Sequence, residues 1–360
     1  MRRLRIAQIA PLAYSIPPKK YGGTERVIHA LTEELVARGH DVTLFATKDS
    51  KTSANLVSVY PLGLKDANIK DLKQWTLLNL LNIGNAYKLQ NEFDLIHDHM
   101  STISIPTANL STVPVVMTLH GQIDNTNKKL FENLDKPYLV SISKSQVKNF
   151  PEVAAVDTVY NGLSLDHYPF SAEHKGYLLF VGRFFVDKGA HFAIQVAREL
   201  NMPLIIAAKL EDKEEKYFND YIYPNLDAKI RWVGEVGEKE RNKLMSEAAA
   251  MLHPATWDEP FGLNMIEAMA CGCPVIAFNK GSIPEVIKDG KSGYVVNSVS
   301  EMINAVKNIE KIDRAFCREY AIKNFSVKRM TDGYESLYYN ILYSLKEKVP
   351  PVFIQESLLS

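Results

Sequence analysis

The chain contains 360 residues, of which 46% are hydrophobic and 23% are charged. This length exceeds what one ordinary core fills and suits two domains, and the composition is that of a folded protein rather than a disordered one. Lys and Arg together number 42, as do Asp and Glu, and this zero net charge argues against nucleic acid as a partner.

Neither a membrane span nor a zinc site made of cysteines is expected. No segment approaches the roughly 18 consecutive apolar residues of a spanning helix, and the first apolar run, 6–10, is too short for the core of a signal peptide. Cys271, Cys273 and Cys317 lack the second pair or histidine cluster of a zinc site and are predicted to be buried thiols. We therefore expect a cytoplasmic protein with at most peripheral membrane contact.

Short apolar strands alternate with amphipathic helices through the first half of the chain. The strands are apolar on both faces, as in a parallel sheet that helices cover on either side. Strands are predicted at 4–10, 42–46, 94–97, 115–119 and 138–141, and helices at 24–38 and 73–90. This pattern indicates a doubly wound α/β domain.

A second alternation follows the polar, turn-rich stretch 163–176, which is interpreted as a linker. Strands are predicted at 177–181, 204–208, 229–233, 249–253 and 274–278, and helices at 191–200, 263–271 and 327–346. The predicted fold is therefore α/β, with two Rossmann-like doubly wound parallel-sheet domains at 1–162 and 163–326. A cleft is expected between the carboxyl ends of the two sheets.

The segment 259–267, Glu-Pro-Phe-Gly-Leu-Asn-Met-Ile-Glu, is the most informative for function. Gly262 lets the backbone approach a ligand closely, and the free amides at the start of the following helix favour a phosphate. Carboxylates accept paired hydrogen bonds from hydroxyls, so one of the two suits a ribose and the other a sugar. The alternative is that Glu259 caps the helix and Glu267 is a solvated charge.

Two cations are predicted at the carboxyl end of the strand 177–181. Arg183 follows the strand, and Lys188 precedes Gly189 and the next helix. A diphosphate leaving group gains negative charge as the glycosidic bond breaks, and cationic side chains stabilise that charge. The alternative is a solvated Lys188 and an ion pair between Arg183 and Asp187.

Two further polar segments follow strands of the first domain. The loop 22–26, Gly-Gly-Thr-Glu-Arg, opens the first helix but lacks the third glycine of a dinucleotide fingerprint. Its amides are candidates for contact with a phosphate or sugar. The segment 97–99, His-Asp-His, has one carboxylate where a DxD metal site needs two, so no metal is expected there. His99 is instead the candidate to line the part of the cleft that binds the acceptor, the second substrate.

At these residues the chain resembles the retaining family-4 glycosyltransferases, often called glycosyl transferases group 1. The likeness covers essentially the whole chain and includes the segments 22–26, 118–121, 160–162, 182–189, 259–267 and 270–276. It implies the GT-B architecture, in which two Rossmann-like domains face each other. It also implies that the C-terminal helix, at about 327–348, packs back on the first domain.

The resemblance implies a role for most of the candidate residues. Arg183 and Lys188 would bind the donor diphosphate and stabilise it during transfer, Glu267 would bind the ribose, and Glu259 would meet the transferred sugar. His120 would lie near the reacting sugar and is counted with Glu259, Arg183 and Lys188 as catalytic. The remaining assignments are Phe261, Gly262, Leu263, Gly22 and Gly23 to donor binding, and Glu25 and His99 to the acceptor side.

The expected reaction is transfer of a hexose-type sugar from a UDP- or GDP-sugar to a carbohydrate, lipid-linked or small-molecule acceptor, with retention and without a metal or other cofactor. No carboxylate suits a double displacement, and the family's usual explanation is front-face attack in which the departing phosphate takes the acceptor's proton. The alternative is a nucleotide-sugar epimerase on a similar fold. The missing dinucleotide fingerprint disfavours an oxidoreductase, and the presence of both cations and both carboxylates disfavours a non-catalytic binding protein.

Overall fold

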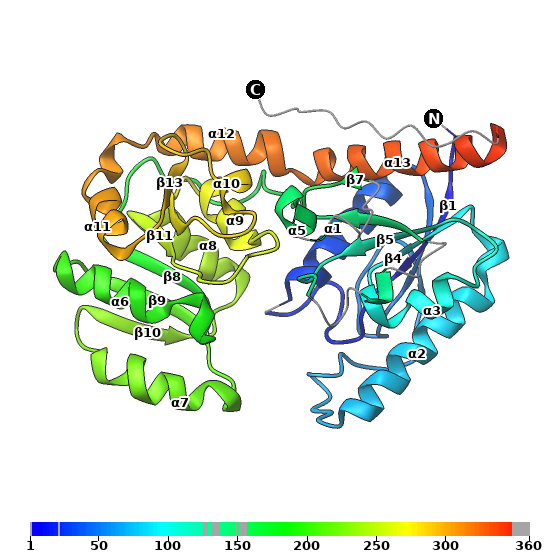
Figure 1. The fold of residues 1–360 in the computed structure, drawn as a ribbon, viewed down its shortest axis with the longest axis horizontal. Coiled ribbons are helices and arrows are strands. Elements are labelled where there is room, and N and C mark those ends of the chain that lie inside the picture. The colour runs from blue at the N-terminus through cyan, green and yellow to red at the C-terminus, as the bar shows by residue number, and fades with distance from the viewer. Residues whose placement is uncertain are drawn as a thin grey trace. The chain divides into compact units, whose positions relative to one another are not determined.

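A computed structural model describes residues 2–20, 22–124, 129–131, 137–148, 150 and 157–347. The chain divides into two compact units (Figure 1). Unit 1 comprises Met1–Ser164 and Val327–Ser360, and unit 2 comprises Leu165–Ser326. These divisions fall beside the domain boundaries predicted after 162 and after 326. Residue 348, the predicted end of the last helix, lies outside the described residues.

Unit 1 is built on a sheet of seven parallel strands in the order β3-β2-β1-β4-β5-β6-β7. The order reverses between β1 and β4, and open α/β sheets bind ligands beside such a reversal, at the carboxyl ends of the strands. The strands are β1 (Arg5–Ile9), β2 (Asp41–Phe45), β3 (Asn55–Val57), β4 (Leu95–Asp98), β5 (Val115–Leu119), β6 (Tyr138–Ser141) and β7 (Asp157–Thr158).

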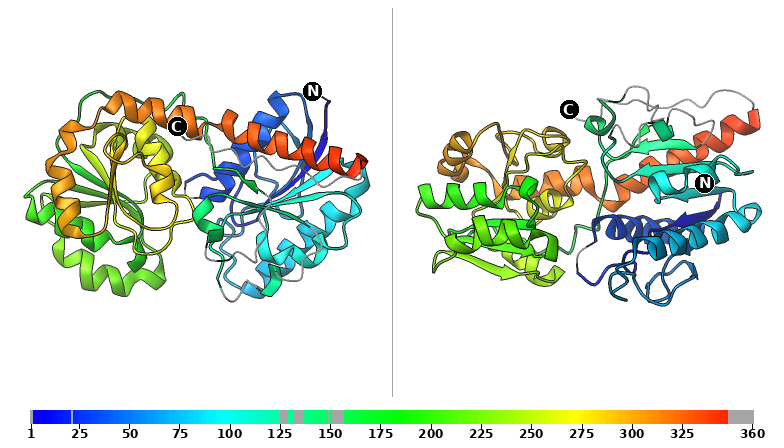
Figure 2. Two further views of the ribbon diagram at one scale, coloured as in Figure 1. Left: turned by 45° about the horizontal axis from the view of Figure 1, so that its top comes forward. Right: turned by 60° about the horizontal axis from the view of Figure 1, so that its bottom comes forward.

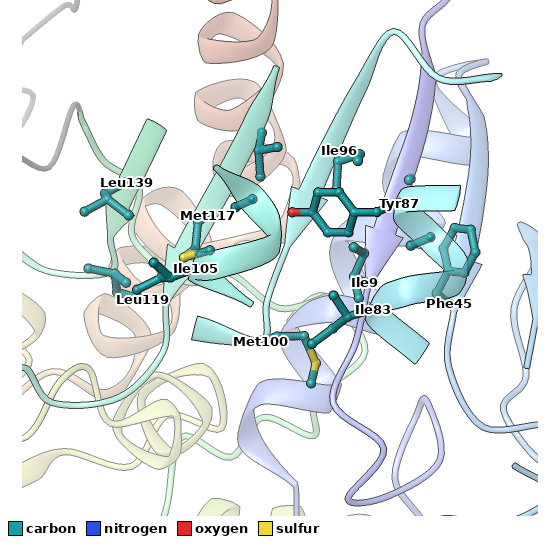
Figure 3. Close-up of a cluster of buried hydrophobic side chains, with 14 of the residues drawn as sticks. Ile9, Phe45, Ile83, Tyr87, Ile96, Met100, Ile105, Met117, Leu119 and Leu139 are labelled. Carbon is teal, nitrogen blue, oxygen red and sulfur yellow. The ribbon is translucent and has the colours of Figure 1, made fainter. Parts of the chain in front are cut away.

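Helices cover both faces of this sheet. The helices are α1 (Gly23–Ala37), α2 (Leu72–Lys88), α3 (Ile105–Ala108), α5 (Lys144–Lys148) and α13 (Val327–Glu347). Side chains alternate between the faces of a strand, and Ile9 and Ile96 pack with Ile83 and Tyr87 of α2 in one apolar cluster (Figure 3). The opposite face carries α13, drawn in red in Figure 2, which also packs against α1.

Unit 2 repeats the same topology with six parallel strands in the order β10-β9-β8-β11-β12-β13. The strands are β8 (Leu178–Arg183), β9 (Leu204–Lys209), β10 (Ile230–Gly234), β11 (Ala250–His253), β12 (Val275–Phe278) and β13 (Gly293–Val296). The helices are α6 (Ala190–Glu199), α7 (Glu215–Tyr217), α8 (Glu238–Glu247), α9 (Leu263–Ala270), α10 (Ile283–Val286), α11 (Val299–Lys307) and α12 (Arg314–Phe325). The switch point here lies between β8 and β11.

The predicted fold class, two Rossmann-like units with parallel sheets, is confirmed. The three cysteines are free and buried, as predicted. The sequence analysis did not predict β3, β7 and β13, nor the helices α8, α11 and α12, which complete the sheets and their covering layers. Within the described ranges, no helix is long and apolar enough to cross a membrane.

Candidate functional site

In unit 2 the candidate residues gather at the carboxyl edge of the sheet, beside its switch point. Arg183 is the last residue of β8, and its partner in the register with β9 is Lys209. The guanidinium of Arg183 lies 4.4 Å from the centre of the Phe185 ring, and the ammonium of Lys213 lies 4.5 Å from the same ring. The edge of the sheet therefore collects several cations, of which the sequence analysis singled out Arg183 and Lys188.

Lys188 and Glu259 form a buried ion pair. The Lys188 ammonium lies 2.5 Å from Oε2 of Glu259, and their side chains are 18% and 9% exposed. The same oxygen accepts a hydrogen bond of 3.1 Å from the Trp257 indole, and the Lys188 ammonium lies 4.5 Å from the centre of that indole ring. The alternatives of a solvated Lys188 and of a helix-capping Glu259 are therefore wrong.

This pair sets the charge state of Glu259. Burial by itself raises the pKa of the carboxyl, but the Lys188 ammonium and the neighbouring His253 outweigh burial and lower that pKa to about 2. Nε2 of His253, at the end of β11, lies 3.4 Å from Oε2 of Glu259. Glu259 is consequently ionised at neutral pH, and both oxygens of an ionised carboxylate accept hydrogen bonds.

Two glycines allow the chain to make the turns that carry this pair. Gly189 follows Lys188 with a φ of 75°, and a Cβ there would lie 2.1 Å from the carbonyl oxygen of Pro254. Gly262 follows Glu259 with a φ of 83° and is the N-cap of α9. Only glycine adopts these left-handed conformations at low cost. The first turn of α9, with Leu263 at its start, thus presents its free backbone amides.

The backbone around Glu259 is held by a turn that the sequence analysis missed. The amide of Ser282 donates a 2.9 Å hydrogen bond to the carbonyl of Glu259, and the hydroxyl of Ser282 donates one of 3.0 Å to the carbonyl of Phe261. The amide of Gly281 donates to a carboxylate oxygen of Asp258 at 3.1 Å. The glycine and serine after β12 are an ordinary turn signal, but nothing in the sequence ties that turn to Glu259.

Glu267 is 2% exposed, so the alternative of a solvated charge is wrong. Its Oε1 accepts hydrogen bonds of 2.9 Å from the Arg241 guanidinium and 3.0 Å from the Tyr168 hydroxyl. Both partners orient the carboxylate, and the Arg241 guanidinium balances its charge. The sequence analysis missed both, because Arg241 stands in the highly charged α8, which resembles a solvated helix, and Tyr168 stands in the predicted linker.

In unit 1, the glycine loop and Glu25 lie after β1. Gly22 is the N-cap of α1 with a φ of 150°, and a Cβ there would meet the Pro18 ring at 2.7 Å. Gly23 is the first residue of the helix. Glu25, in the first turn, is 5% exposed, and burial raises the pKa of its carboxyl to about 7. A carboxyl with that pKa changes its charge near neutral pH.

The two candidate histidines of unit 1 contact each other. His99 follows β4 and His120 follows β5, which are neighbouring strands. Nδ1 of His99 lies 2.9 Å from Nε2 of His120, and Nε2 of His99 lies 2.6 Å from Oε1 of Gln8 on β1. His99 is buried and His120 is half-buried. Burial lowers the pKa of His120 to about 4 and that of His99 well below its ordinary value, so both rings are neutral at pH 7.

The backbone on either side of His120 is fixed by one amide. Nε2 of Gln146, on α5, donates hydrogen bonds of 2.6 Å to the carbonyls of both Leu119 and Gly121. Oε1 of the same amide accepts 2.9 Å from the backbone amide of Ile142. Both N–H groups of this side chain are therefore used to hold the segment that carries His120, while its oxygen ties it to the chain after β6. The sequence analysis did not predict this role for Gln146.

His97, the third histidine, joins the sheet to α13. Its Nδ1 lies 2.6 Å from the Tyr338 hydroxyl and its Nε2 lies 2.7 Å from the Thr118 hydroxyl, which in turn lies 2.8 Å from the Tyr334 hydroxyl. All four side chains are buried. Across the residues for which side chains are described, no group of three or more His, Cys, Asp and Glu is placed to hold a metal ion.

Two family models together match residues 21–323. Residues 21–173 match the model described as Glycosyltransferase Family 4, and residues 168–323 match the model described as Glycosyl transferases group 1. The glycogen synthase of Mycobacterium tuberculosis (strain ATCC 25618 / H37Rv) is 25% identical over 361 residues, covering 84% of this chain and 86% of that protein. An uncharacterised 41.2 kDa protein in the cps region of Klebsiella pneumoniae is 30% identical over 375 residues, covering 88% and 96%.

Solved structures of the same fold cover most of the chain. A sucrose-phosphate synthase from Thermosynechococcus elongatus matches with a TM-score of 0.76 and 20% identity over 95% of this chain and all of that chain. HepE of Anabaena, solved in complex with UDP-glucose, matches with a TM-score of 0.70 and 17% identity over 95% and 100%. The predicted GT-B fold is thereby confirmed. The glycogen synthase and the sucrose-phosphate synthase are both named as glycosyl-transferring enzymes, and they give the epimerase alternative no support.

Proposed function

Since this chain belongs to the glycosyltransferases that combine the Family 4 and group 1 modules, we propose that it transfers a hexose-type sugar from a nucleoside-diphosphate sugar with retention of the anomeric configuration. The donor is proposed to be a UDP- or GDP-sugar. The acceptor is proposed to be a carbohydrate, a lipid-linked glycan or a small molecule. The HepE complex with UDP-glucose supports a nucleotide sugar as the donor of this fold.

The observation that carries the proposal is the desolvated pair of Lys188 and Glu259 beside the first turn of α9. It brings an ammonium and an ionised carboxylate, which are 71 residues apart in the chain, together with free helix amides in unit 2. An ammonium and helix amides bind phosphate, whereas a carboxylate binds hydroxyls. A ligand that carries a diphosphate next to a sugar satisfies all of these groups together.

Charge stabilisation is the main contribution expected of this site to catalysis. As the glycosidic bond breaks, negative charge grows on the diphosphate, and Arg183 and Lys188 lower the energy of that state. In the proposed front-face mechanism, the departing phosphate takes the proton of the acceptor hydroxyl. Glu259 then orients the sugar, Glu267 binds the ribose, and the amides of 261–263 bind phosphate or sugar oxygens. No metal is proposed, because cationic side chains take its part.

In unit 1 the proposed roles are assigned to groups whose chemistry suits a phosphate, a sugar or an acceptor hydroxyl. The loop with Gly22 and Gly23 is proposed to bring backbone amides near the phosphates. His120 is assigned to the reacting sugar, and His99 and Glu25 to the acceptor side. A buried carboxyl with a pKa of about 7 suits a site where a neutral hydroxyl is bound, because it need not be charged there.

The proposal is tested by incubating the purified chain with UDP-, GDP- and ADP-sugars and with carbohydrate, lipid-linked and small-molecule acceptors, and following release of the nucleoside diphosphate in the presence of a chelator. Turnover of one donor is expected, with the anomeric signal of the product, read by NMR, matching that of the donor. Lys188→Ala is expected to lower turnover more than tenfold and Glu259→Ala to abolish it. Normal turnover by both variants, or an inverted product, would contradict the proposal.

A substitution that keeps the size of the Glu259 side chain separates the proposed part of Lys188 in nucleotide binding from that of Glu259 in sugar transfer. Glu259→Gln removes the negative charge that holds Lys188 but keeps the size of the side chain. We expect it to bind the free nucleoside diphosphate at least as tightly as the wild-type chain, because the ammonium no longer has a competing anion, while transfer is lost. Isothermal titration of the nucleotide that the wild type uses measures this difference. A weaker nucleotide affinity in Glu259→Gln would contradict this expectation and would show that Glu259 is needed to hold the Lys188 ammonium in place for the diphosphate.

A further inference from the structure

Trp257 contacts both members of the buried ion pair between Lys188 and Glu259. Its indole N–H donates a hydrogen bond of 3.1 Å to Oε2 of Glu259, the oxygen that also binds the Lys188 ammonium. The same ammonium lies over the face of the indole, 4.5 Å from the ring centre. An indole suits both contacts, because its N–H only donates while its π face attracts a cation.

Backbone contacts hold the loop that carries Trp257 in place. The preceding residue, Thr256, donates an amide hydrogen bond of 2.8 Å to the carbonyl of Asp187, which stands just before the lysine. A Cβ at Gly189, just after the lysine, would lie 2.1 Å from the carbonyl oxygen of Pro254. The two loops therefore touch on both sides of the lysine, and the backbone sets the position of the indole relative to the ion pair.

A diphosphate that binds the Lys188 ammonium competes with Glu259 for it. The side chain of Glu259 is only 9% exposed, and a buried charge that loses its partner is strongly destabilised. Within the part of the chain that the structure describes, the other hydrogen bond to this carboxylate comes from Trp257, and His253 adds a longer contact of 3.4 Å. The indole N–H is therefore the donor in place to support Glu259 once the ammonium turns to a phosphate.

We infer that Trp257 is a positioning residue of the donor site, whose indole N–H stabilises the Glu259 carboxylate when a diphosphate draws the Lys188 ammonium away. The inference rests on the proposed function, in which Lys188 binds the donor diphosphate. The ring face keeps the ammonium close throughout, because its attraction for a cation does not depend on the carboxylate. Trp257 acts through Lys188 and Glu259 and needs no contact with the substrate.

Unfolding of the full chain without nucleotide tests the support of Glu259 by itself. Lys188→Met withdraws the ammonium permanently, and Trp257→Phe removes the indole N–H while it keeps an aromatic ring. In urea at pH 7, Trp257→Phe should raise the unfolding equilibrium constant about fivefold more in the Lys188→Met chain than in the wild-type chain, the value of one hydrogen bond. Equal effects in the two chains would overturn the inference.

Isothermal titration with UDP, GDP or ADP, whichever the wild-type chain binds, tests the part of Trp257 in donor binding. Trp257→Phe should weaken the affinity about fivefold. In a Glu259→Gln chain the same substitution should change the affinity by at most about twofold, because an uncharged amide needs no compensation when the ammonium turns to the phosphate. A substitution that merely loosened the loop would weaken binding equally in both chains, and that result would contradict the inference.

Trp232→Phe is the matched control, because the Trp232 indole lies in the same unit and donates a hydrogen bond of 2.9 Å to an uncharged acceptor, the carbonyl of Ala208. Its effects on unfolding and on nucleotide affinity should be the same with and without Lys188→Met or Glu259→Gln. A dependence as large as that of Trp257→Phe would count against the inference. If the wild-type chain binds none of the three nucleotides, the proposed function fails, and the unfolding experiment still decides whether the indole supports Glu259.

Discussion

Removal of the Lys188 ammonium should destabilise the chain, because it leaves the carboxylate of Glu259 buried without its partner. The pair is desolvated, with side-chain exposures of 18% and 9%. The pKa of Glu259 lies at about 2 instead of its ordinary 4.5, and one pKa unit corresponds to about 1.4 kcal/mol. The ionised form is therefore stabilised in the folded chain by about 3 kcal/mol. Lys188→Met should cost a similar amount at pH 7.

The lowered pKa of Glu259 also predicts how the stability difference between wild type and Lys188→Met changes with pH. A carboxyl whose pKa is lowered on folding contributes stability that is present above its unfolded pKa and lost as pH falls through the folded one. For Glu259 this window runs from about pH 4.5 down to about pH 2. The gap in unfolding free energy between wild type and Lys188→Met should therefore be full at pH 7 and shrink as the pH approaches 2. Adding Glu259→Gln to Lys188→Met should recover most of the loss at pH 7.

Urea unfolding of the four chains of this double-mutant cycle, at pH 7 and at pH 3, measures both effects. Lys175→Met is the matched control, because the Lys175–Glu247 pair lies in the same unit with a separation of 2.9 Å but with 64% of the lysine side chain exposed. Exposed pairs contribute about 0–1 kcal/mol. If Lys188→Met and Lys175→Met lost equally little at both pH values, the reasoning from desolvation would be refuted.

Three further predictions concern stability. Glu25→Gln should leave stability unchanged at pH 4 and raise it by about 3 kcal/mol at pH 8. The reason is that the pKa of the Glu25 carboxyl rises to about 7 on folding, so the wild-type chain loses stability as the pH climbs from about 4.5 to 7. Equal melting temperatures of both chains at pH 8 would contradict this prediction. Gly189→Ala should lower the free energy of unfolding in urea clearly more than Gly234→Ala does. Both glycines have a left-handed backbone, which by itself costs an alanine about 1–2 kcal/mol. A Cβ at Gly189 would in addition lie 2.1 Å from the Pro254 oxygen, whereas a Cβ at Gly234 meets nothing within 4 Å. Arg38→Met should speed hydrogen exchange in 327–347, because Arg38 donates hydrogen bonds of 2.7 Å to both Asp332 and Glu335 of α13; unchanged exchange there would show that these bonds do not hold the helix.

The sheets were predictable because their strands are continuous apolar runs. The runs at 115–119 and 138–141 coincide with β5 and β6, and the strand predicted at 177–181 differs from β8 mainly at its polar end, Gly182-Arg183. Helices that bury polar side chains were missed. Arg314 at the start of α12 donates to the backbone carbonyls of Ser171, Ala248 and Ser246, and no periodicity in the sequence reveals such long-range partners.

The sequence likewise predicted only some of the residues of the candidate site. The glycines and charged residues of 182–189 and 259–267 were found because turns, helix starts and charges leave local signals. The partners of those residues were not, because each comes from a distant part of the chain: Arg241 and Tyr168 for Glu267, and Gln8 for His99. The contact between His99 and His120 follows only once β4 and β5 are known to be neighbours.

The central claim, a donor diphosphate site in unit 2 that works through cationic side chains, is tested most directly by thermal unfolding with UDP, GDP and ADP at millimolar concentration, each with Mg²⁺ and with a chelator. At about a hundred times Kd, binding stabilises by about 2.7 kcal/mol, which is a clear shift in Tm. The account predicts a shift with one of these nucleotides that persists in chelator and disappears in Lys188→Met. A shift that needs Mg²⁺, or no shift with any of them, would contradict it.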